Sequence, residues 1–326
     1  MLDFISTDME FECKDIKFLA HYLKPEAQYS SGWQKYYLDG CEKMAIWINP
    51  VYHLLRIEGS VPYFWQGNNF SFTRKGFSDA IEYIIRLLGV NIWNSTLNAF
   101  EYGVIMEVQM PPKEYIMHHS SMPKEKLLMN EKPKDKGNFR TWEDRYVRLK
   151  MYNAGRNILM KQGENRKSII RAAGWDDSKY YLKWEAHYLK PECLNHGNGL
   201  KLYNLVNPDW DNTFKEDLYT QYKRLSPMKG IINPTDKKEL STADILILAM
   251  VEESINEGRT LDELRKMLYD KVNSFPDEVL KKPDKDFRKM QIRKLLAKVK
   301  ESPNSVFDLS EEITKARRNL VLLSFE

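Results

Sequence analysis

Three segments of this chain alternate between apolar residues and residues that are charged or form hydrogen bonds, the pattern of a strand with one buried face. They read YVRLKMYN (146–153), AFEYGVIMEV (99–108) and YYLKWEAHYL (180–189). Successive side chains of a strand point to opposite faces, so each segment would place its apolar residues on one face and its polar residues on the other. The chain is therefore expected to build a sheet with one face in the core and one face that meets solvent or a ligand.

Further segments of the sequence indicate the fold class. Strand-like runs occur at Leu2–Phe11, 43–50 and Tyr52–Val61, and a run with apolar residues at helical spacing, TRKGFSDAIEYIIRLLGV, covers residues 73–90. Gly89 is a natural end for that helix. Strands that follow one another with few helices between them favour an α+β fold, here a mainly antiparallel sheet with helices on one face.

The periodicity of apolar residues changes near residue 232, where strand-like alternation stops and helical patterns continue to the end. We therefore expect two domains, residues 1–231 and residues 232–326, the second smaller and α-helical. Helices are predicted in 241–258, 260–272, which opens with a T-x-x-E capping box, and 286–300. The third carries exposed cations that either form a solvated face or contact DNA phosphates: Arg288, Arg293 and Lys294.

Composition limits the classes of protein that fit. Of 326 residues, 42% are apolar and 29% charged, with a net charge of +4, and no run approaches the ~18 apolar residues of a membrane span. The acidic first residues do not resemble a secretion signal, so a cytoplasmic location without membrane contact is expected. Three cysteines without a CxxC spacing indicate neither a disulfide framework nor a zinc site. Nucleotide-hydrolase, dinucleotide-binding and serine-hydrolase motifs are absent.

The polar faces of the three alternating segments together hold carboxylates, cations, an imidazole and a phenol. Carboxylates bind Mg²⁺ or Mn²⁺, cations hold phosphate, and a hydroxyl can attack it, so this inventory fits metal-dependent phosphoryl transfer. A tyrosine needs a metal or a cation beside it to attack at neutral pH. An ordinary solvent-facing sheet surface is the alternative. The candidates are Glu101 and Glu185 for metal, Arg148 and Lys150 for phosphate, Tyr152 as nucleophile, and Glu107 and His187 as second choices.

Two other features carry less information. Residues 120–140, which are polar and rich in lysine, are expected to form a surface loop. The adjacent His118 and His119 are expected on a helix, where they would lie about 100° apart, a poor arrangement for binding one metal.

The order of motifs resembles a known family. RIEGSVPYFWQGNNF, TRKGFSDAIEYIIRLLGV, AFEYGVIMEV, VRLKMYNAGRN, YYLKWEAHYLKPE and GLKLYNLVN follow one another between about residues 46 and 230. This succession is similar to that of the phage and plasmid replication proteins that include the filamentous-phage initiators and related proteins of Bacteroidetes mobile elements. The similarity lies in pattern and order rather than in one signature.

The resemblance implies a rolling-circle replication initiator with a Rep- or relaxase-like nicking domain. Such an enzyme nicks and joins single-stranded origin DNA through a 5′-phosphotyrosine link, with Mg²⁺ or Mn²⁺ as cofactor and a host helicase as a partner. Tyr152 matches the tyrosine of the family's YDK or YNK element, Glu101 the glutamate of its EFG strand, and Glu185 that of its LRFE or LRWE strand. Lys150 would lie beside the attacked phosphate.

The chain departs from the family at two points. Ala154 stands where the family often has a lysine, and the next cation is Arg156. The pair of histidines separated by one apolar residue, which many nicking enzymes use for metal, is absent. Arg148, Arg156 and Lys183 are the expected DNA contacts of the first domain. The alternatives are a non-catalytic protein that binds single-stranded DNA or RNA and a metal-dependent nuclease that uses water as its nucleophile.

Overall fold

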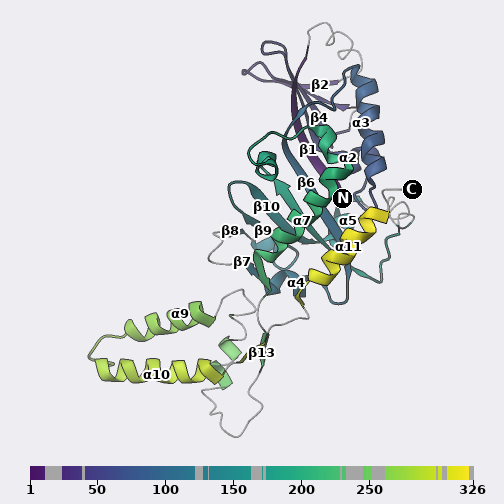
Figure 1. The fold of residues 1–326 in the computed structure, drawn as a ribbon. Coiled ribbons are helices and arrows are strands. Elements are labelled where there is room, and N and C mark those ends of the chain that lie inside the picture. Colours follow the sequence, from purple (N-terminus) through teal and green to yellow (C-terminus); the bar gives the residue numbers. More distant parts are fainter. Residues whose placement is uncertain are drawn as a thin grey trace.

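The computed structural model describes residues 1–11, 24–38, 41–121, 128–130, 132–162, 171, 174–227, 230–232, 245–247, 249–251, 254, 261–298, 300–302 and 307–322. Its main body is a ten-stranded antiparallel sheet, and helices lie against it (Figure 1). The predicted class, α+β with a mainly antiparallel sheet, is confirmed.

The strands of the sheet are ordered β2-β3-β4-β5-β1-β6-β11-β10-β9-β8. The four that build the site lie side by side in its middle: β1 (Leu2–Glu10), β6 (Thr96–Val108), β11 (Tyr180–Tyr188) and β10 (Val147–Asn153). The others are β2 (Lys24–Gln28), β3 (Gln34–Tyr37), β4 (Met44–Asn49), β5 (Leu54–Ser60), β8 (Leu128–Asn130) and β9 (Phe139–Glu143). All six predicted strands are present, with ends shifted by three residues at most.

The predicted surface loop at 120–140 is only partly correct. Residues 122–127 and 131 lie outside the described part of the chain, but β8, the 3₁₀ helix Pro133–Asp135 and the start of β9 fall within the range. β8 and β9 pair at the end of the sheet. Three-residue strands in a polar segment carry too little alternation to be recognised from sequence.

One face of the sheet forms the main core with three long helices, α3 (Arg74–Leu88), α7 (Pro208–Lys223) and α11 (Ser310–Leu322). Phe100 of β6 stacks on Tyr188 of β11 with ring centroids 4.7 Å apart, and Phe214 of α7 packs edge-on against Phe100 at 5.3 Å. The predicted helix α3 begins at the cap Thr73, whose Oγ1 accepts a hydrogen bond from the Gly76 amide. It ends at Gly89, whose φ of 67° suits glycine.

Short elements connect these parts. They are α2 (Val61–Trp65), α4 (Pro112–His118), β7 (His119–Ser121), α5 (Ala154–Gln162), the 3₁₀ helices Pro191–Asn195 and Leu202–Leu205, and β12 (Leu225–Pro227), which pairs with β7. α5 packs on the second face of the sheet in a small cluster of Phe70, Ala154, Ile158, Trp175 and Tyr181. No helix in the described part of the chain is long and apolar enough to cross a membrane.

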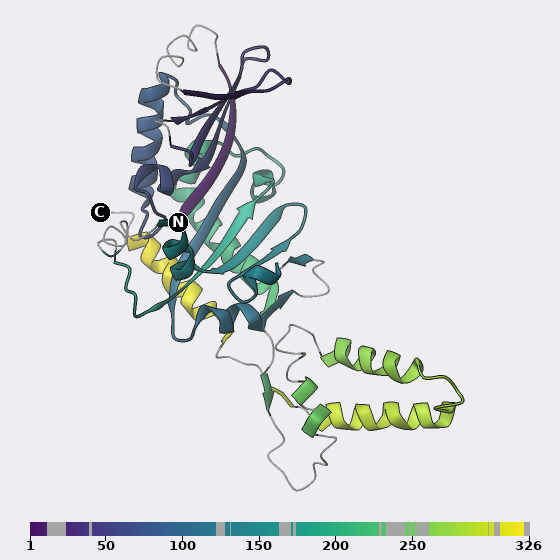
Figure 2. The same cartoon turned by 180° about the vertical axis from the view of Figure 1, so that it is seen from behind.

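Beyond residue 232 the described residues are mainly helical, apart from the short strand β14 (Lys300–Ser302), but the last helix belongs to the main body. α9 (Leu261–Asn273) and α10 (Lys282–Lys298) form a hairpin that projects from the sheet beside the β13–β14 ladder, Gly230–Ile232 paired with Lys300–Ser302 (Figure 2). The chain then returns, and Leu309 and Ile313 join the main core. Within the described ranges, the β13–β14 ladder is a separate small sheet, and the hairpin packs with Val251 in a core of its own. The capping residue Thr260 and most of the helix predicted at 241–258 lie outside the described residues.

Candidate functional site

The sheet register brings the polar residues of β6, β10 and β11 onto one face, as predicted. Across β10 and β11, Lys150 lies opposite Glu185 and Tyr152 opposite Lys183. Across β11 and β6, His187 lies opposite Glu101. The intervening residues of the same strands, such as Leu149 and Trp184, point into the main core. The second face of the sheet therefore carries the inventory that the alternation indicated.

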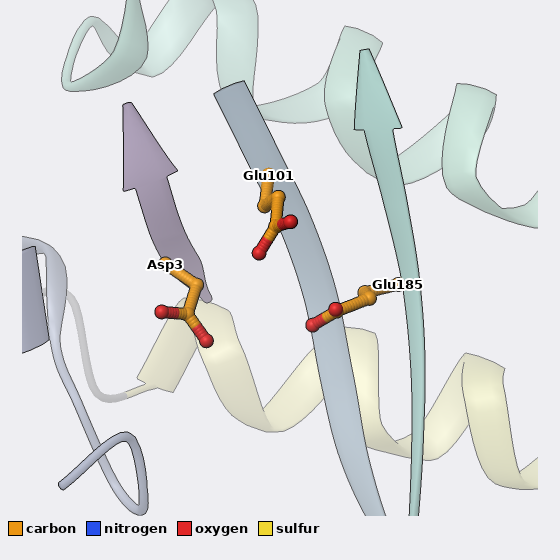
Figure 3. Close-up of side chains that lie close together, drawn as sticks. All are labelled: Asp3, Glu101 and Glu185. Atoms are coloured by element: carbon orange, nitrogen blue, oxygen red, sulfur yellow. The ribbon is translucent and has the colours of Figure 1, made fainter. Parts of the chain in front are cut away.

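A bulge in β1 adds a residue that sequence reasoning did not identify, Asp3. Leu2 pairs with Tyr102 and Ile5 with Phe100, so two residues of β1, Asp3 and Phe4, occupy the space opposite Glu101. Such a bulge redirects side chains, and Asp3 points to the site face while Ile5 stays in the core. Figure 3 shows the carboxylates of Asp3, Glu101 and Glu185 converging from three neighbouring strands.

The three carboxylates form a buried cluster that could hold a metal ion. One oxygen of each of Asp3, Glu101 and Glu185 lies within 4.8 Å of the others, and the three residues are 6%, 8% and 3% exposed. An all-oxygen donor set of this kind suits a hard divalent cation, so the residues fit Mg²⁺ or Mn²⁺ by their chemistry. Nothing in the cluster distinguishes these two metals.

Two lysines and a histidine hold the carboxylates. Lys183 Nζ lies 2.6 Å from Asp3 Oδ2 and 2.5 Å from Glu185 Oε2. Lys150 Nζ pairs with Glu101 Oε1 and lies 3.2 Å from Glu185 Oε1. His187 Nδ1 is 2.6 Å from Glu101 Oε1. Every carboxylate of the cluster thus has a cationic or hydrogen-bonding partner, as buried charges require.

Two polar side chains also donate hydrogen bonds to the Asp3 carboxylate. Ser60 Oγ donates to Asp3 Oδ1 at 2.5 Å and Asn69 Nδ2 donates to Asp3 Oδ2 at 2.9 Å. Burial alone would raise the pKa of Asp3, but the Lys183 ammonium and these hydrogen bonds outweigh it and hold that pKa below its usual value. For Glu101 too, burial would raise the pKa, and His187 and Lys150 lower it. Both groups therefore stay ionised at neutral pH.

These lowered pKa values predict a loss of stability in acid. A carboxyl whose pKa is lower in the folded than in the unfolded protein stabilises the fold above its unfolded pKa and loses that contribution as the pH falls through the folded pKa. Asp3→Asn, which mimics the protonated acid, should lower the free energy of unfolding most above about pH 5, and the difference from wild type should shrink below about pH 4. Urea unfolding across this range measures it. A difference independent of pH would contradict the assignment.

A pocket of about 1210 Å³ opens over the cluster. It is lined by Asp3, Glu101, Lys150, Tyr152 and Glu185, and by further amide and cationic side chains: Lys43, Gln66, Asn68, Asn69, Asn138, Asn153, Arg156 and Asn157. A cavity of this size exceeds that of most small-ligand sites, whose volumes run to roughly 1,000 Å³. It could admit a segment of an extended polymer.

Tyr152, the predicted nucleophile, lies in the wall of this pocket. Its hydroxyl is 3.4 Å from Glu185 Oε2, and the Lys183 ammonium is 5.5 Å from its ring centroid. Burial, and then the Glu185 charge, raise the pKa of Tyr152 well above 10, while Lys183 lowers it. In the absence of a bound cation the phenol is therefore protonated. A divalent cation on the carboxylates would oppose the effect of Glu185.

The other predicted DNA contacts are distributed over the molecule. Arg148 pairs with Glu143 at 2.5 Å on the same face as Lys150, and Arg156 is exposed and lines the pocket. Lys183, by contrast, is fully buried among the carboxylates. Glu107 lies toward the end of β6 and pairs with Lys179. Exposed on α10, in the projecting hairpin, are Arg288, Arg293 and Lys294.

The neighbouring histidines 118 and 119 are not brought to the cluster. His118 is the last residue of α4, and its ring stacks on Phe307 at 3.8 Å. His119 is buried, with Nδ1 2.7 Å from the Tyr115 carbonyl oxygen and Nε2 2.9 Å from the Tyr222 hydroxyl. Burial lowers the pKa of His119 to about 4, so its ring is neutral and structural.

The described face thus combines a possible cation site, a phenol and polymer-sized space within one pocket. Metal-dependent chemistry at a phosphorus or carbonyl centre can use such oxygen donors, together with a nucleophile near them. Comparisons of the chain with protein-family models, with curated proteins and with solved structures found no match.

Proposed function

We propose that this protein is a metal-dependent DNA-nicking enzyme of the replication-initiator kind, which cuts and rejoins single-stranded origin DNA through a phosphotyrosine link. The observation that carries the proposal is the position of Tyr152, whose hydroxyl lies in the same pocket as the carboxylates of Asp3, Glu101 and Glu185. A nucleophile beside metal ligands on one sheet face is an arrangement that can transfer a phosphodiester to a tyrosine.

In the proposed reaction, the carboxylates and Tyr152 have different roles. Asp3, Glu101 and Glu185 would hold Mg²⁺ or Mn²⁺, which polarises the phosphodiester when bound. Tyr152 Oη forms a bond to phosphorus while the bond from phosphorus to the 3′ oxygen breaks, and the 3′ oxygen takes a proton from water. The phenolic proton passes to water, and Glu185 Oε2, 3.4 Å away, accepts a hydrogen bond that orients the phenol. Rejoining is the reverse displacement, by the 3′ hydroxyl on the phosphotyrosine.

An exposed ring beside Tyr152 supports a single strand as the substrate. Phe139, 37% exposed, lies beside Tyr152 with ring centroids 5.8 Å apart, and an exposed ring next to the reacting group offers a surface on which an unpaired base can stack. Arg156, which also lines the pocket, would meet a neighbouring phosphate. On α10, the exposed Arg288, Arg293 and Lys294 would contact DNA outside the pocket.

The test is a search for a covalent adduct. The protein is incubated with labelled single-stranded oligonucleotides from its own genetic neighbourhood, with Mn²⁺ or with EDTA, and run on a denaturing gel. We expect a protein-linked band that requires Mn²⁺ and disappears in Tyr152→Phe, because phenylalanine lacks the attacking oxygen. Tyr146→Phe is the matched control, because Tyr146 immediately precedes the same strand but is 36% exposed, and it should retain the adduct. An adduct that survives in Tyr152→Phe would exclude the assignment.

A second candidate is a metal-dependent nuclease that uses water as the nucleophile. It is favoured by the burial of Tyr152 and by its raised pKa, both of which oppose formation of a phenolate. The same carboxylates would serve, and the same gel separates the two, since this enzyme would cut in the presence of Mn²⁺ without ever becoming linked to DNA. Binding that needs no metal and produces no cut would instead indicate a non-catalytic DNA-binding protein.

A further inference from the structure

The two lysines of the cluster differ in their access to the pocket. Lys183 is 0% exposed and lies behind the carboxylates, between Asp3 and Glu185. The Lys150 side chain is 16% exposed and lines the pocket, and its ammonium contacts Glu101 Oε1 and Glu185 Oε1. Lys150 therefore covers the open side of the carboxylates, and Lys183 closes their inner side.

Charge and space make Lys150 a competitor for any cation that enters from the pocket. Three carboxylates and two ammonium groups leave one net negative charge, which is less than a divalent cation requires. Lys150 contacts oxygens of two of the three residues able to bind the metal. The ligand oxygens lie within 4.8 Å of one another, so a cation bound among them and the Lys150 ammonium would repel each other strongly. Without Lys150 the cluster would carry two net negative charges and match a divalent cation.

We propose that Lys150 occupies the cation site until a divalent metal displaces its ammonium into the pocket, where it becomes the phosphate-binding group beside Tyr152. Tyr152 is two residues further along β10 on the same face, so the released ammonium remains on the side where a phosphodiester would bind. The flexible stem of lysine allows this movement, which the buried Lys183 cannot make. Metal entry would thus create the phosphate site. This inference rests on the metal site of the proposed function.

The first test measures Mn²⁺ affinity by calorimetry, without DNA and at constant pH. Lys150→Met should bind Mn²⁺ about tenfold more tightly or better, since the cation no longer has to displace an ammonium from Glu101 and Glu185. Arg148→Met is the matched control, because Arg148 shares the strand and face but pairs with Glu143, and its Mn²⁺ affinity should stay near that of wild type. Equal or weaker binding by Lys150→Met would overturn the displacement.

The second test uses wild-type protein and does not depend on the folding of a variant. Lysine acetylation is followed by peptide mass spectrometry with and without saturating Mn²⁺. Lys150 should react slowly without metal and several-fold faster with it, while Lys179, which is half exposed and pairs with Glu107 rather than with the cluster, should not change. An unchanged Lys150 rate with Mn²⁺ bound overturns the inference alone. If neither wild type nor Lys150→Met binds Mn²⁺, the metal site of the proposed function fails as well.

Discussion

Replacing Lys183 by methionine is expected to lower the free energy of unfolding by about 3–5 kcal/mol, because it leaves two buried carboxylates without their shared cation. Asp3 and Glu185 both approach the Lys183 ammonium to within 2.6 Å, and Lys183 is fully buried. Methionine fills a similar volume, so lost packing contributes little. Urea unfolding at pH 7, followed by tryptophan fluorescence, gives the value.

Lys179→Met is the control for this substitution. Lys179 directly precedes the same strand and pairs with Glu107 at 2.9 Å, but both side chains are about half exposed. Exposed pairs contribute about 0–1 kcal/mol, so this variant should unfold almost as wild type does. A loss below about 1 kcal/mol for Lys183→Met would show that the buried pair contributes no more than a surface pair.

The same unfolding measurement, applied to a double-substitution cycle and repeated with Mn²⁺, tests how the residues of the cluster interact. Because Asp3 and Lys183 share one interaction, Asp3→Asn combined with Lys183→Met should cost less than the sum of the two single losses. Mn²⁺ should stabilise Lys183→Met more than wild type, since the cation then replaces a missing positive charge. Additive losses would show that the two residues act independently.

The parts of the fold that sequence could predict are those with long, regular periodicity. The alternation in 99–108, 146–153 and 180–189 predicted β6, β10 and β11, and the helical spacing from Phe77 to Leu88 predicted α3. Because the alternation also decides which side chains share a face, it correctly predicted that Glu101, Lys150, Tyr152 and Glu185 lie on the same face of the sheet.

The parts that sequence could not predict depend on contacts between distant segments. Asp3 reaches the site face only because a bulge breaks the alternation of β1, and nothing in LDFIS indicates where that bulge lies. The one signal in the sequence was an acidic residue, Asp3, among mainly apolar neighbours. The ion pair between Lys183 and Asp3 could not be predicted either, because the two residues are 180 positions apart in the sequence. Lys183 was therefore predicted to contact DNA, although it is buried. The return of α11 to the sheet likewise depends on tertiary packing.

Gly103→Ala is expected to disturb the same site through the backbone. Gly103 lies opposite Glu185, and a Cβ added there would come within 2.5 Å of Glu185 Cβ and 2.6 Å of the Trp184 carbonyl oxygen. Since the obstacle includes backbone, β6 and β11 must separate in the middle of the sheet, which should lower the free energy of unfolding by about 3 kcal/mol. The movement of Glu185 should also weaken Mn²⁺ binding.

The control for Gly103→Ala is an alanine where there is room for it. At Gly155, in the first turn of α5, an added Cβ would meet no atom nearer than 3.6 Å, and helical alanine is favoured over glycine by about 1 kcal/mol, so Gly155→Ala should leave the free energy of unfolding equal or slightly higher. Parallel urea titrations and Mn²⁺ calorimetry on the two variants separate the effects. If Gly103→Ala matched Gly155→Ala in both measurements, the close approach of β6 and β11 would not be what places Glu185 against Asp3 and Glu101.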